Sequence, residues 1–208
     1  MAGALLVDER RDHIVKAAYE LLASEGLEGL TIRSVLAYTG LARRAFYERF
    51  ASKDDLVLAV FQFTLADAAK RFAGHMRALE CPTDRLRLIV TGIVMGHGFL
   101  GDNDQWQENR RAAALSREHL RLAEARPAQL QHAIEPLVSL IAQQLSAGVG
   151  AGLVREANIE RMALLVYNLV STTVHSQLIA EERILPDLED RARLAEDIWQ
   201  FCLRAVAA

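Results

Sequence analysis

The chain has 208 residues, of which 51% are hydrophobic, and it carries a formal net charge of −3 at pH 7. This apolar content is ample for a buried core, as in a soluble globular protein. A charge of this sign spread evenly would argue against binding to nucleic acid, so the distribution of charge along the chain decides that question.

Cysteine usage and the apolar stretches indicate a reduced, cytoplasmic protein. Cys81 and Cys202 are the only cysteines and lie far apart, so the sequence offers no disulfide framework. The longest apolar-rich stretches are interrupted by glycine, histidine and hydroxyl residues, which favours buried helices over membrane spans. The first residues lack the basic segment and apolar run of a secretory signal.

A first helix is expected over residues 8–25, after about seven loose residues. Its apolar positions, among them Ile14, Ala18 and Leu22, recur at helical spacing and form one stripe. Gly26 follows this stripe and is a candidate C-terminal cap, because glycine readily adopts the left-handed conformation that ends many helices.

Residues 30–56 are predicted to form a helix-turn-helix. Thr31 can cap a first short helix, and Gly40 ends it. In the second short helix Phe46 and Phe50 lie four residues apart on one face, so we expect both to be buried against the first helix.

The opposite face of the second helix is basic, with Arg44 and Glu48 at its centre and Arg43 and Tyr47 beside them. Guanidinium groups suit the guanine edge in the major groove, and a tyrosine hydroxyl suits a phosphate. Residues 31–53 hold five basic side chains and one acidic one, whereas the rest of the chain beyond them has 20 acidic and 16 basic residues. The basic charge is therefore local, as a DNA-binding surface requires.

This segment resembles the DNA-binding domain of the TetR family of bacterial transcriptional regulators. The resemblance is carried by Gly26, Thr31, Gly40, Leu41, Phe46, Tyr47, Phe50, Lys53 and Leu56, in the family's order and spacing. It implies a homodimer that binds double-stranded DNA with this domain and a small-molecule effector with the later helices. The residues predicted to contact DNA are Thr31, Arg33, Arg43, Arg44, Ala45, Tyr47, Arg49 and Lys53.

The sequence departs from the family pattern at three points. Leu36 stands where alanine is usual, Ala42 replaces the serine that commonly caps the recognition helix, and Arg44–Ala45 replaces a common Gly-Thr pair. These changes keep the fold expectation but leave the operator sequence unpredictable. Arg49 stands where histidine is common, and it is expected to keep a phosphate donor.

An alternative stays open on the sequence alone. The chain could be a helical small-molecule-binding protein or enzyme whose N-terminal three-helix unit is only structural, because short helix-turn-helix matches give frequent false positives. The sequence also does not separate a repressor from an activator.

The rest of the chain is predicted to be helical. Ser52 is expected to cap a helix over residues 54–79, with Lys53 at its positive end beside the DNA backbone. The β-branched run at residues 88–94 would also suit a buried strand, but the helical spacing on both sides favours a helix. Further helices are expected over residues 83–100, 106–126, 130–149, 158–182 and 187–207, with a turn at 101–104.

Several aromatic, methionine and histidine residues of these helices are candidates for lining an effector cavity, although core packing is the competing interpretation for each. His97 stands out because it shares the apolar face of its helix. We expect a mostly apolar, neutral molecule with one or two polar anchors. The candidates are Phe63, Phe72, Met76, Ile93, His97, Trp106, Met162, Tyr167 and His175.

No catalytic or metal site is expected. The six histidines show no pair at metal-ligand spacing. A phosphate-binding glycine loop, paired carboxylates and a Ser/His/Asp arrangement are also not discernible. The sequence therefore predicts no metal, no cofactor and no enzymatic activity.

The helix expected over residues 158–182 is apolar almost all round, so it must be covered on every side. One face can pack on its own domain, and the remainder needs a second copy of the chain. The last helix offers a matching stripe, which predicts a four-helix dimer interface. Its predicted residues are Leu165, Leu169, Thr172, His175, Ile179, Leu194, Ile198, Phe201 and Cys202.

Together these features predict an all-α protein with a helix-turn-helix DNA-binding domain over residues 1–53 and a larger effector-binding and dimerisation domain over residues 54–208. The predicted function is that of a homodimeric transcriptional repressor, released from a palindromic operator by a small, largely apolar molecule.

Overall fold

The computed structural model describes residues 2–96, 105–181 and 187–208, and for residues 2–8 and 105–109 it describes only the backbone. Within these ranges the chain is helical apart from one isolated bridge between Val154 and Ala207, which confirms the predicted all-α fold. The elements are α1 (Ala2–Gly29), α2 (Ile32–Thr39), α3 (Arg43–Tyr47), α4 (Lys53–His75), η1 (Met76–Ala78), α5 (Pro82–Met95), α6 (Gln105–Ala125), α7 (Pro127–Gly150), α8 (Ile159–Ala180) and α9 (Leu188–Val206).

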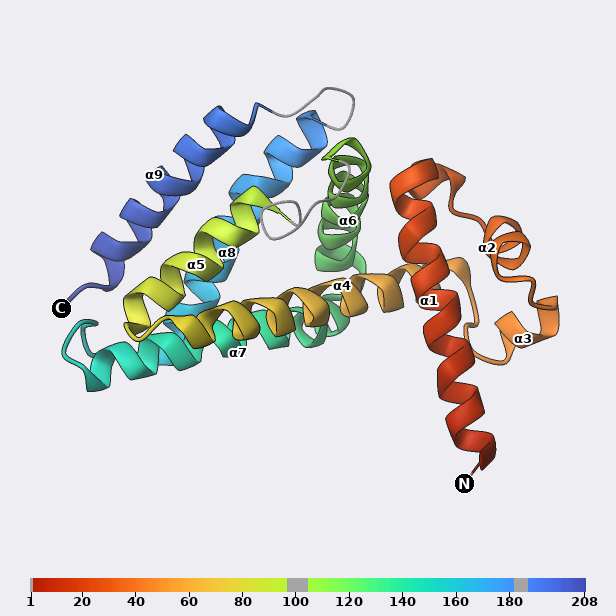
Figure 1. The fold of residues 1–208 in the computed structure, drawn as a ribbon, viewed down its shortest axis with the longest axis horizontal. Coiled ribbons are helices and arrows are strands. Elements are labelled where there is room, and N and C mark those ends of the chain that lie inside the picture. The colour runs from red at the N-terminus through yellow and green to blue at the C-terminus, as the bar shows by residue number, and fades with distance from the viewer. Residues whose placement is uncertain (1, 97–104, 182–186) are drawn as a thin grey trace.

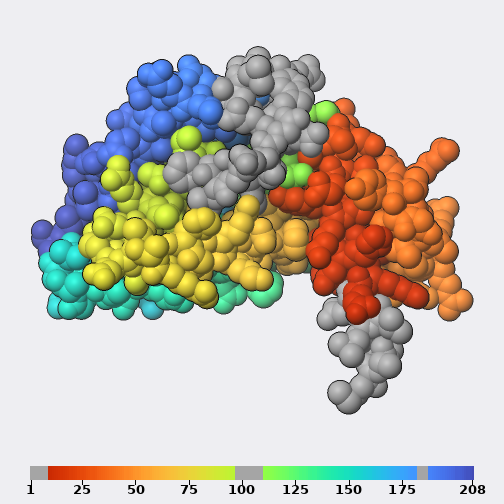
Figure 2. All heavy atoms as spheres, viewed as in Figure 1, coloured from red at the N-terminus to blue at the C-terminus, as the bar shows by residue number. Residues whose placement is uncertain are grey.

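The molecule is elongated, with its N-terminal helices and its last helix at opposite ends (Figure 1). Helices α1, α2 and α3 lie at one end of the long axis, α9 lies at the other, and α4 runs between them (Figure 1). In the space-filling view α1 separates the α2–α3 region from the larger helical body (Figure 2). Among the described residues, no helix combines the length and apolar character that crossing a lipid bilayer requires.

Helix α1 differs from the expectation at both ends. It begins at Ala2, although the first seven residues were expected to be loose, and it ends at Gly29. Gly26 has φ 71° and ψ −174°, so the glycine predicted to end the helix instead kinks it. One further turn forms beyond the kink, where the Leu30 N–H donates to the Gly26 carbonyl at 3.2 Å.

Helices α1 to α3 share an apolar core with the start of α4. Phe46 and Phe50 are 0% and 3% exposed, as predicted, and their ring centroids lie 5.6 Å apart. The same cluster includes Leu56 and Val60 of α4. The predicted division between residues 53 and 54 stays a prediction, and it falls within one continuous helix.

Helix α4 is shorter than predicted. The α-helix ends at His75 and tightens into the single 3-10 turn η1. Pro82 then opens α5 at a position where its missing N–H has no helical partner to lose. Helix α5 ends before Gly96, which has φ 76°. The predicted continuation of this helix to Leu100 and the turn at residues 101–104 lie outside the described residues.

Helices α4 to α9 enclose a second, larger core. Helix α5 packs on α9, α7 packs on α4 and α8, and α6 packs on both α8 and α1. The predicted caps of the last two helices are confirmed: Asn158 accepts a hydrogen bond from the Arg161 N–H at 2.8 Å, and Asp187 accepts one from the Asp190 N–H at 3.0 Å. Helices α4 and α6 both contact α1 as well as the larger body.

Candidate nucleic-acid interface and effector cavity

Hydrogen bonds at both ends of α2 hold the helix-turn-helix. The Thr31 hydroxyl accepts from the Ser34 N–H at 3.0 Å, and the Ser34 hydroxyl accepts from the Thr31 N–H at 2.8 Å, which makes a capping box. Gly40, with φ 67°, ends α2 and donates its N–H to the Leu36 carbonyl at 3.0 Å. The predicted cap at Thr31 is confirmed, and its partner Ser34 was not foreseen.

Helix α3 presents Arg43 and Tyr47 together on its outer side. Both side chains are exposed, Tyr47 by 46%. The Arg43 guanidinium donates to the Tyr47 hydroxyl at 3.4 Å and lies 5.5 Å from the ring centroid. This hydrogen bond raises the pKa of Arg43. Ala42, before the helix, provides no side-chain cap, as its identity implied.

The side chain of Arg44 is 89% exposed. Its Nε donates to the Glu48 carboxylate at 2.9 Å. Hydrogen bonds from Arg44 and then Arg49 lower the pKa of Glu48, so the carboxylate is charged at neutral pH. An exposed pair of this kind contributes little to stability, so a DNA group can replace Glu48 as the partner of Arg44.

The remaining predicted contacts near α2 and α3 differ in exposure. Arg33 is exposed and Ala45 is half-buried. Tyr38 on α2 is 59% exposed and was not selected from the sequence. Helical periodicity did not reveal this exposure, because a residue three positions after the buried Val35 lies only about 60° from it around the helix.

Arg49 is a correction to the predicted DNA-contacting set. Only 4% of its side chain is exposed, and Nη1 donates to the Ala45 carbonyl at 2.7 Å and to the Glu48 carboxylate at 3.3 Å. Helical periodicity placed Arg49 on the flank of the reading helix. However, α3 ends at Tyr47, and the side chain of Arg49 folds back onto the preceding turn.

Lys53 has a structural contact in addition to its predicted role. The residue is half-buried, and its Nζ donates to the Leu27 carbonyl at 3.0 Å, which ties the start of α4 to the end of α1. An ammonium group carries three protons, so this contact leaves capacity for a phosphate.

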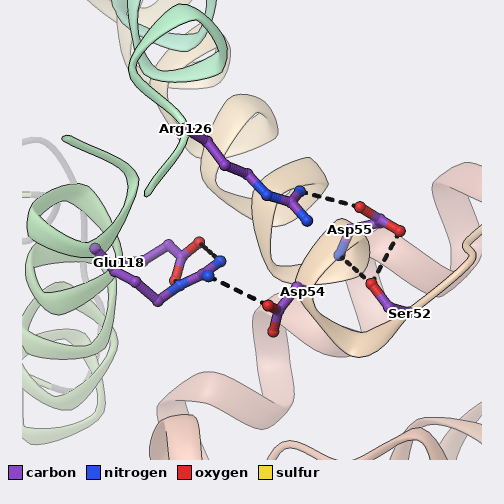
Figure 3. Close-up of polar contacts among 6 residues, drawn as sticks. Ser52, Asp54, Asp55, Glu118 and Arg126 are labelled. Carbon is purple, nitrogen blue, oxygen red and sulfur yellow. Dashed lines mark hydrogen bonds and ion pairs between the residues drawn. The ribbon is translucent and has the colours of Figure 1, made fainter. Parts of the chain in front are cut away.

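A group of charged residues fastens the start of α4 to α6 and to the residue before α7 (Figure 3). Arg126 donates to Asp55 at 3.1 Å, and Arg121 donates to Asp54 at 3.2 Å. Arg121 also makes two hydrogen bonds, of 2.8 and 2.7 Å, to Glu118, which is 1% exposed. We call these five residues the α4 clamp. It ties the start of α4, at the base of the helix-turn-helix, to α6.

A cavity of about 150 Å³ lies among α4, α5, α6, α7 and α8. Its walls are mostly apolar, and the described lining residues include no aspartate or glutamate. The lining residues are Phe61, Thr64, Leu65, Ala68, Arg71, Phe72, Gly92, Ile93, Gly96, Arg111, Ala112, Leu115, Ser116, His119, Leu137, Tyr167, Ser171, Val174, His175 and Leu178.

Four of the predicted lining residues, Phe72, Ile93, Tyr167 and His175, border this cavity. Three others do not, and their placement corrects the prediction. Phe63 packs beside the N-terminal core, where its ring meets that of Tyr19 edge-on with centroids 5.7 Å apart, and Met76 and Met162 belong to the larger core. His97 lies outside the described residues, and of Trp106 only the backbone is described.

The side chains of His119 and His175 both line the cavity. Only His175 was predicted from the sequence to do so. The ring centroid of His119 lies 4.3 Å from that of His175 and 6.3 Å from that of Tyr167. Burial lowers the pKa of His119 to about 4, and burial together with repulsion from His119 lowers the pKa of His175 to about 3. Burial also raises the pKa of Tyr167, so all three groups are uncharged at neutral pH. His119 was missed because its sequence neighbours are charged. Its four-residue spacing from the apolar Leu115 was the available signal.

Arg111 belongs both to the cavity wall and to the seat of α1. It is 5% exposed, and its Nε donates to the Tyr19 carbonyl at 3.1 Å while Nη2 donates to the Glu20 carboxylate at 3.3 Å. The neighbouring Arg110 donates to the Ser24 carbonyl at 2.7 Å. Helix α6 therefore contacts the cavity on one side and α1 on the other.

The exposed apolar surface of α8 and α9 is narrower than predicted. Leu165, Leu169 and Phe201 are 64%, 36% and 61% exposed. Ile198 and Cys202 are only 7% and 1% exposed and pack in the chain's own core, which removes them from the predicted interface. The amphipathic pattern of α9 has two apolar flanks, and the sequence alone did not show which one meets α5.

The other predicted interface residues fall into three groups. His175 borders the cavity, Thr172 is exposed, and Ile179 and Leu194 are half-buried.

Comparison with known proteins supports the interpretation that the N-terminal helices form a DNA-binding domain. Residues 14–60 match the protein-family model described as "Bacterial regulatory proteins, tetR family". No curated protein sequence matches the chain.

Several solved structures share its fold over nearly the whole length. The FadR regulator of Bacillus subtilis, in complex with stearoyl-CoA, has a TM-score of 0.70 at 14% identity, covering 92% of this chain and 96% of its own. FadR of Bacillus halodurans gives 0.70 at 17% identity, with 93% and 94% covered. A protein of Saccharomonospora viridis described as a transcriptional regulator, in complex with choline, gives 0.68 at 17% identity, with 97% and 99% covered.

The helix-turn-helix with its exposed basic residues, joined to a helical body with an internal cavity, defines a transcriptional regulator with a DNA-binding and a ligand-binding domain. Residues 14–60 carry the DNA-binding domain of the tetR family of bacterial regulatory proteins, and the whole chain shares the fold of the solved structures named above.

Proposed function

We propose that this protein is a homodimeric repressor that leaves a palindromic operator when a small, largely apolar molecule enters the cavity. The main support for this proposal is that α6 contacts both the cavity and the helices that hold the helix-turn-helix. Arg111 borders the cavity and bonds to α1, and Arg121 of the same helix bonds to Asp54 at the start of α4. A ligand that displaces α6 acts on both supports of the helix-turn-helix at once.

The proposed DNA contacts divide into two kinds. Arg43 and Arg44 reach base edges in the major groove, because guanidinium groups match the guanine acceptors. Tyr47 and Lys53 bind phosphates and position the helix. Arg33 is exposed near the start of α2 and adds a phosphate contact.

Dimerisation is proposed through α8 and α9. Leu165, Leu169 and Phe201 are large apolar side chains that a single chain leaves exposed, and such side chains gathered on neighbouring helices commonly mark an interface. In a dimer whose two-fold axis lies beside α8 and α9, the two DNA-binding units lie at opposite ends of the dimer. Their spacing should then match successive major grooves, about 34 Å apart.

Release from DNA is proposed as a population shift between two arrangements of the dimer. The ligand must bind the arrangement that does not fit DNA more tightly than the one that does. Moving the equilibrium from 99:1 to 1:99 requires a difference of about 5.5 kcal/mol. Contacts at the cavity wall and at the α4 clamp connect ligand binding to the position of the DNA-binding helices.

A gel-shift assay on the DNA flanking the protein's own gene tests the proposal. We expect a shift at low salt that weakens steeply as salt rises, because phosphate contacts release counterions. The shift should be lost in a variant carrying both Arg43→Ala and Arg44→Ala. A purified, folded dimer that shifts none of the flanking DNA at low salt would refute the proposal and favour a ligand-binding protein without a DNA role.

A further inference from the structure

The cavity has a polar end that restricts the chemistry of its ligand. Nδ1 of His175 is buried and has no hydrogen-bond partner among the described residues. A buried polar atom left without a partner is unfavourable, because it has given up its hydrogen bonds to water. A ligand that brings a hydrogen-bonding group to this end therefore gains more than one that fills the cavity with hydrocarbon alone.

Two imidazoles are available to one such group. His119 and His175 both border the cavity, with ring centroids 4.3 Å apart and planes tilted by 56°. A neutral imidazole offers one N–H donor and one nitrogen lone pair. Burial keeps both rings neutral at pH 7, since it lowers both pKa values well below their usual range. A hydroxyl, which donates one hydrogen bond and accepts another, can serve both rings when one presents its lone pair and the other its N–H.

Two of the side-chain hydroxyls that line the cavity are already engaged. The Thr64 hydroxyl donates to the Val60 carbonyl at 2.8 Å, and the Ser171 hydroxyl donates to the Asn168 carbonyl at 3.4 Å. The hydroxyls of Ser116 and Tyr167 also line the cavity, but the two imidazoles are the polar groups that lie together there, and one of them holds the buried atom without a partner.

We propose that the cavity selects an uncharged, mostly apolar molecule that carries a hydroxyl group, aliphatic or phenolic, bound between His119 and His175. The hydroxyl donates to one ring and accepts from the other. This inference rests on the proposed effector role of the cavity and specifies the class of effector.

Charged ligands of the same size fit less well. A carboxylate would have to leave water for a mostly apolar cavity, which costs far more than burying a hydroxyl, and the guanidinium groups of Arg71 and Arg111 already pair with Asp67 and Glu20. A quaternary ammonium can neither donate nor accept, and it would meet the guanidinium groups of Arg71 and Arg111 in a wall whose described residues carry no acid. The lining of α4 from Phe61 to Phe72 spans about 16 Å, which leaves room for an extended chain of eight carbons.

Four octyl probes test the inference on the purified full-length protein by calorimetry at pH 7.5. They are 1-octanol, 1-methoxyoctane, octanoate and octyltrimethylammonium. We expect 1-octanol to bind at least tenfold more tightly than each of the others, because the methoxy compound keeps the acceptor and lacks the donor. Equal affinity for 1-octanol and any charged probe would overturn the inference, as would no binding of 1-octanol.

Substitutions test whether the two imidazoles are responsible for the preference for 1-octanol. His119→Phe and His175→Phe should each weaken 1-octanol binding about tenfold. The variant that removes the ring accepting the hydroxyl proton should leave the affinity for 1-methoxyoctane unchanged, which shows that the cavity is intact. His132→Phe, at an exposed site on α7, is the matched control and should behave as the parent. Parent-like 1-octanol affinity in both cavity variants would overturn the inference. Operator binding without any probe is measured separately, so a failed ligand class and a failed regulatory function give different results.

Discussion

The guanidinium carbon of Arg111 lies 3.8 Å from the centroid of the Tyr19 ring. Arg111 belongs to the cavity wall and Tyr19 to α1, so this buried stacking contact joins the ligand-binding body to the DNA-binding unit. A cation over an aromatic ring contributes up to about 2 kcal/mol when water is excluded. The contact is therefore strong enough to transmit a displacement of α6 to α1.

Replacing this residue should uncouple the two domains. Arg111→Met keeps much of the side-chain volume and removes the charge, the stacking and the hydrogen bond to the Tyr19 carbonyl. We expect the free energy of unfolding to fall by about 2 kcal/mol and the effect of 1-octanol on operator affinity to shrink. Arg87→Met, which removes an exposed pair with Glu196, is the control. The role assigned to Arg111 is wrong if its variant releases DNA as fully as the parent does.

Two neighbouring arginines should differ in what they affect. Arg44→Ala should cost about 1–3 kcal/mol at one operator base pair and change stability little, since its partner Glu48 is exposed. Arg49→Ala should lower the free energy of unfolding by about 1–2 kcal/mol without changing base preference, because its side chain is buried. A panel of operator variants and urea unfolding measure the two effects. Similar profiles for the two variants would contradict the division.

Lys53 should act on all DNA sequences alike. Lys53→Ala removes a proposed phosphate contact together with the bond to the Leu27 carbonyl. We expect weaker binding to every operator variant and a salt dependence reduced by about one counterion. Binding titrations at several salt concentrations check this. A loss confined to one operator position would point to base contact instead.

The imidazole pair should make stability depend on pH. Both pKa values are lowered in the folded state relative to 6.5, so the unfolded chain binds more protons as the pH falls below that value. Stability is therefore fully present above about pH 6.5 and declines as the pH falls toward 4. Allowing for residual solvent access, the loss between pH 7 and 5 should be about 2 kcal/mol for the pair.

The His119→Phe, His175→Phe double variant should show a flatter profile over the same range. Urea unfolding at pH 7, 6 and 5 compares it with the parent. Equal slopes for the two proteins would mean that the imidazoles do not titrate as their burial implies.

Charge placed on the proposed dimer face should dissociate the protein. Leu165→Glu puts a carboxylate at a 64% exposed site on α8, where it is harmless to the monomer and unfavourable in a dry interface. Leu120→Glu, at a 50% exposed site on α6, is the matched control. Analytical ultracentrifugation at micromolar concentration should give a monomer for the first and a dimer for the second. A dimeric Leu165→Glu protein would move the interface elsewhere.

The order of the helices was predictable because it depends on local signals. Caps at Thr31, Ser52, Asn158 and Asp187 mark helix starts in the sequence, and each of them forms the expected hydrogen bond. Gly26 shows the limit of such signals. The same glycine preference ends a helix or kinks it, depending on whether the following residues can form another turn.

The sites were less predictable because side-chain direction depends on packing between distant elements. Arg49 was assigned to DNA by periodicity, but the early end of α3 turns it inward. His119 was overlooked because charged residues surround it in the chain, although the packing of α6 on α8 brings it beside His175. Ile198 and Cys202 lie on the flank of α9 that meets α5, which amphipathicity alone does not reveal.

The absence of a linker between the two domains has a practical consequence for engineering. Leu56 and Val60 of α4 pack in the N-terminal core, while Phe61 and Phe72 of the same uninterrupted helix border the cavity. A hybrid sensor that joins this body to a foreign operator-reading unit must therefore be spliced inside a helix. Each residue added or removed at the junction rotates one half against the other by about 100°, so only grafts that keep the helical phase should remain inducible.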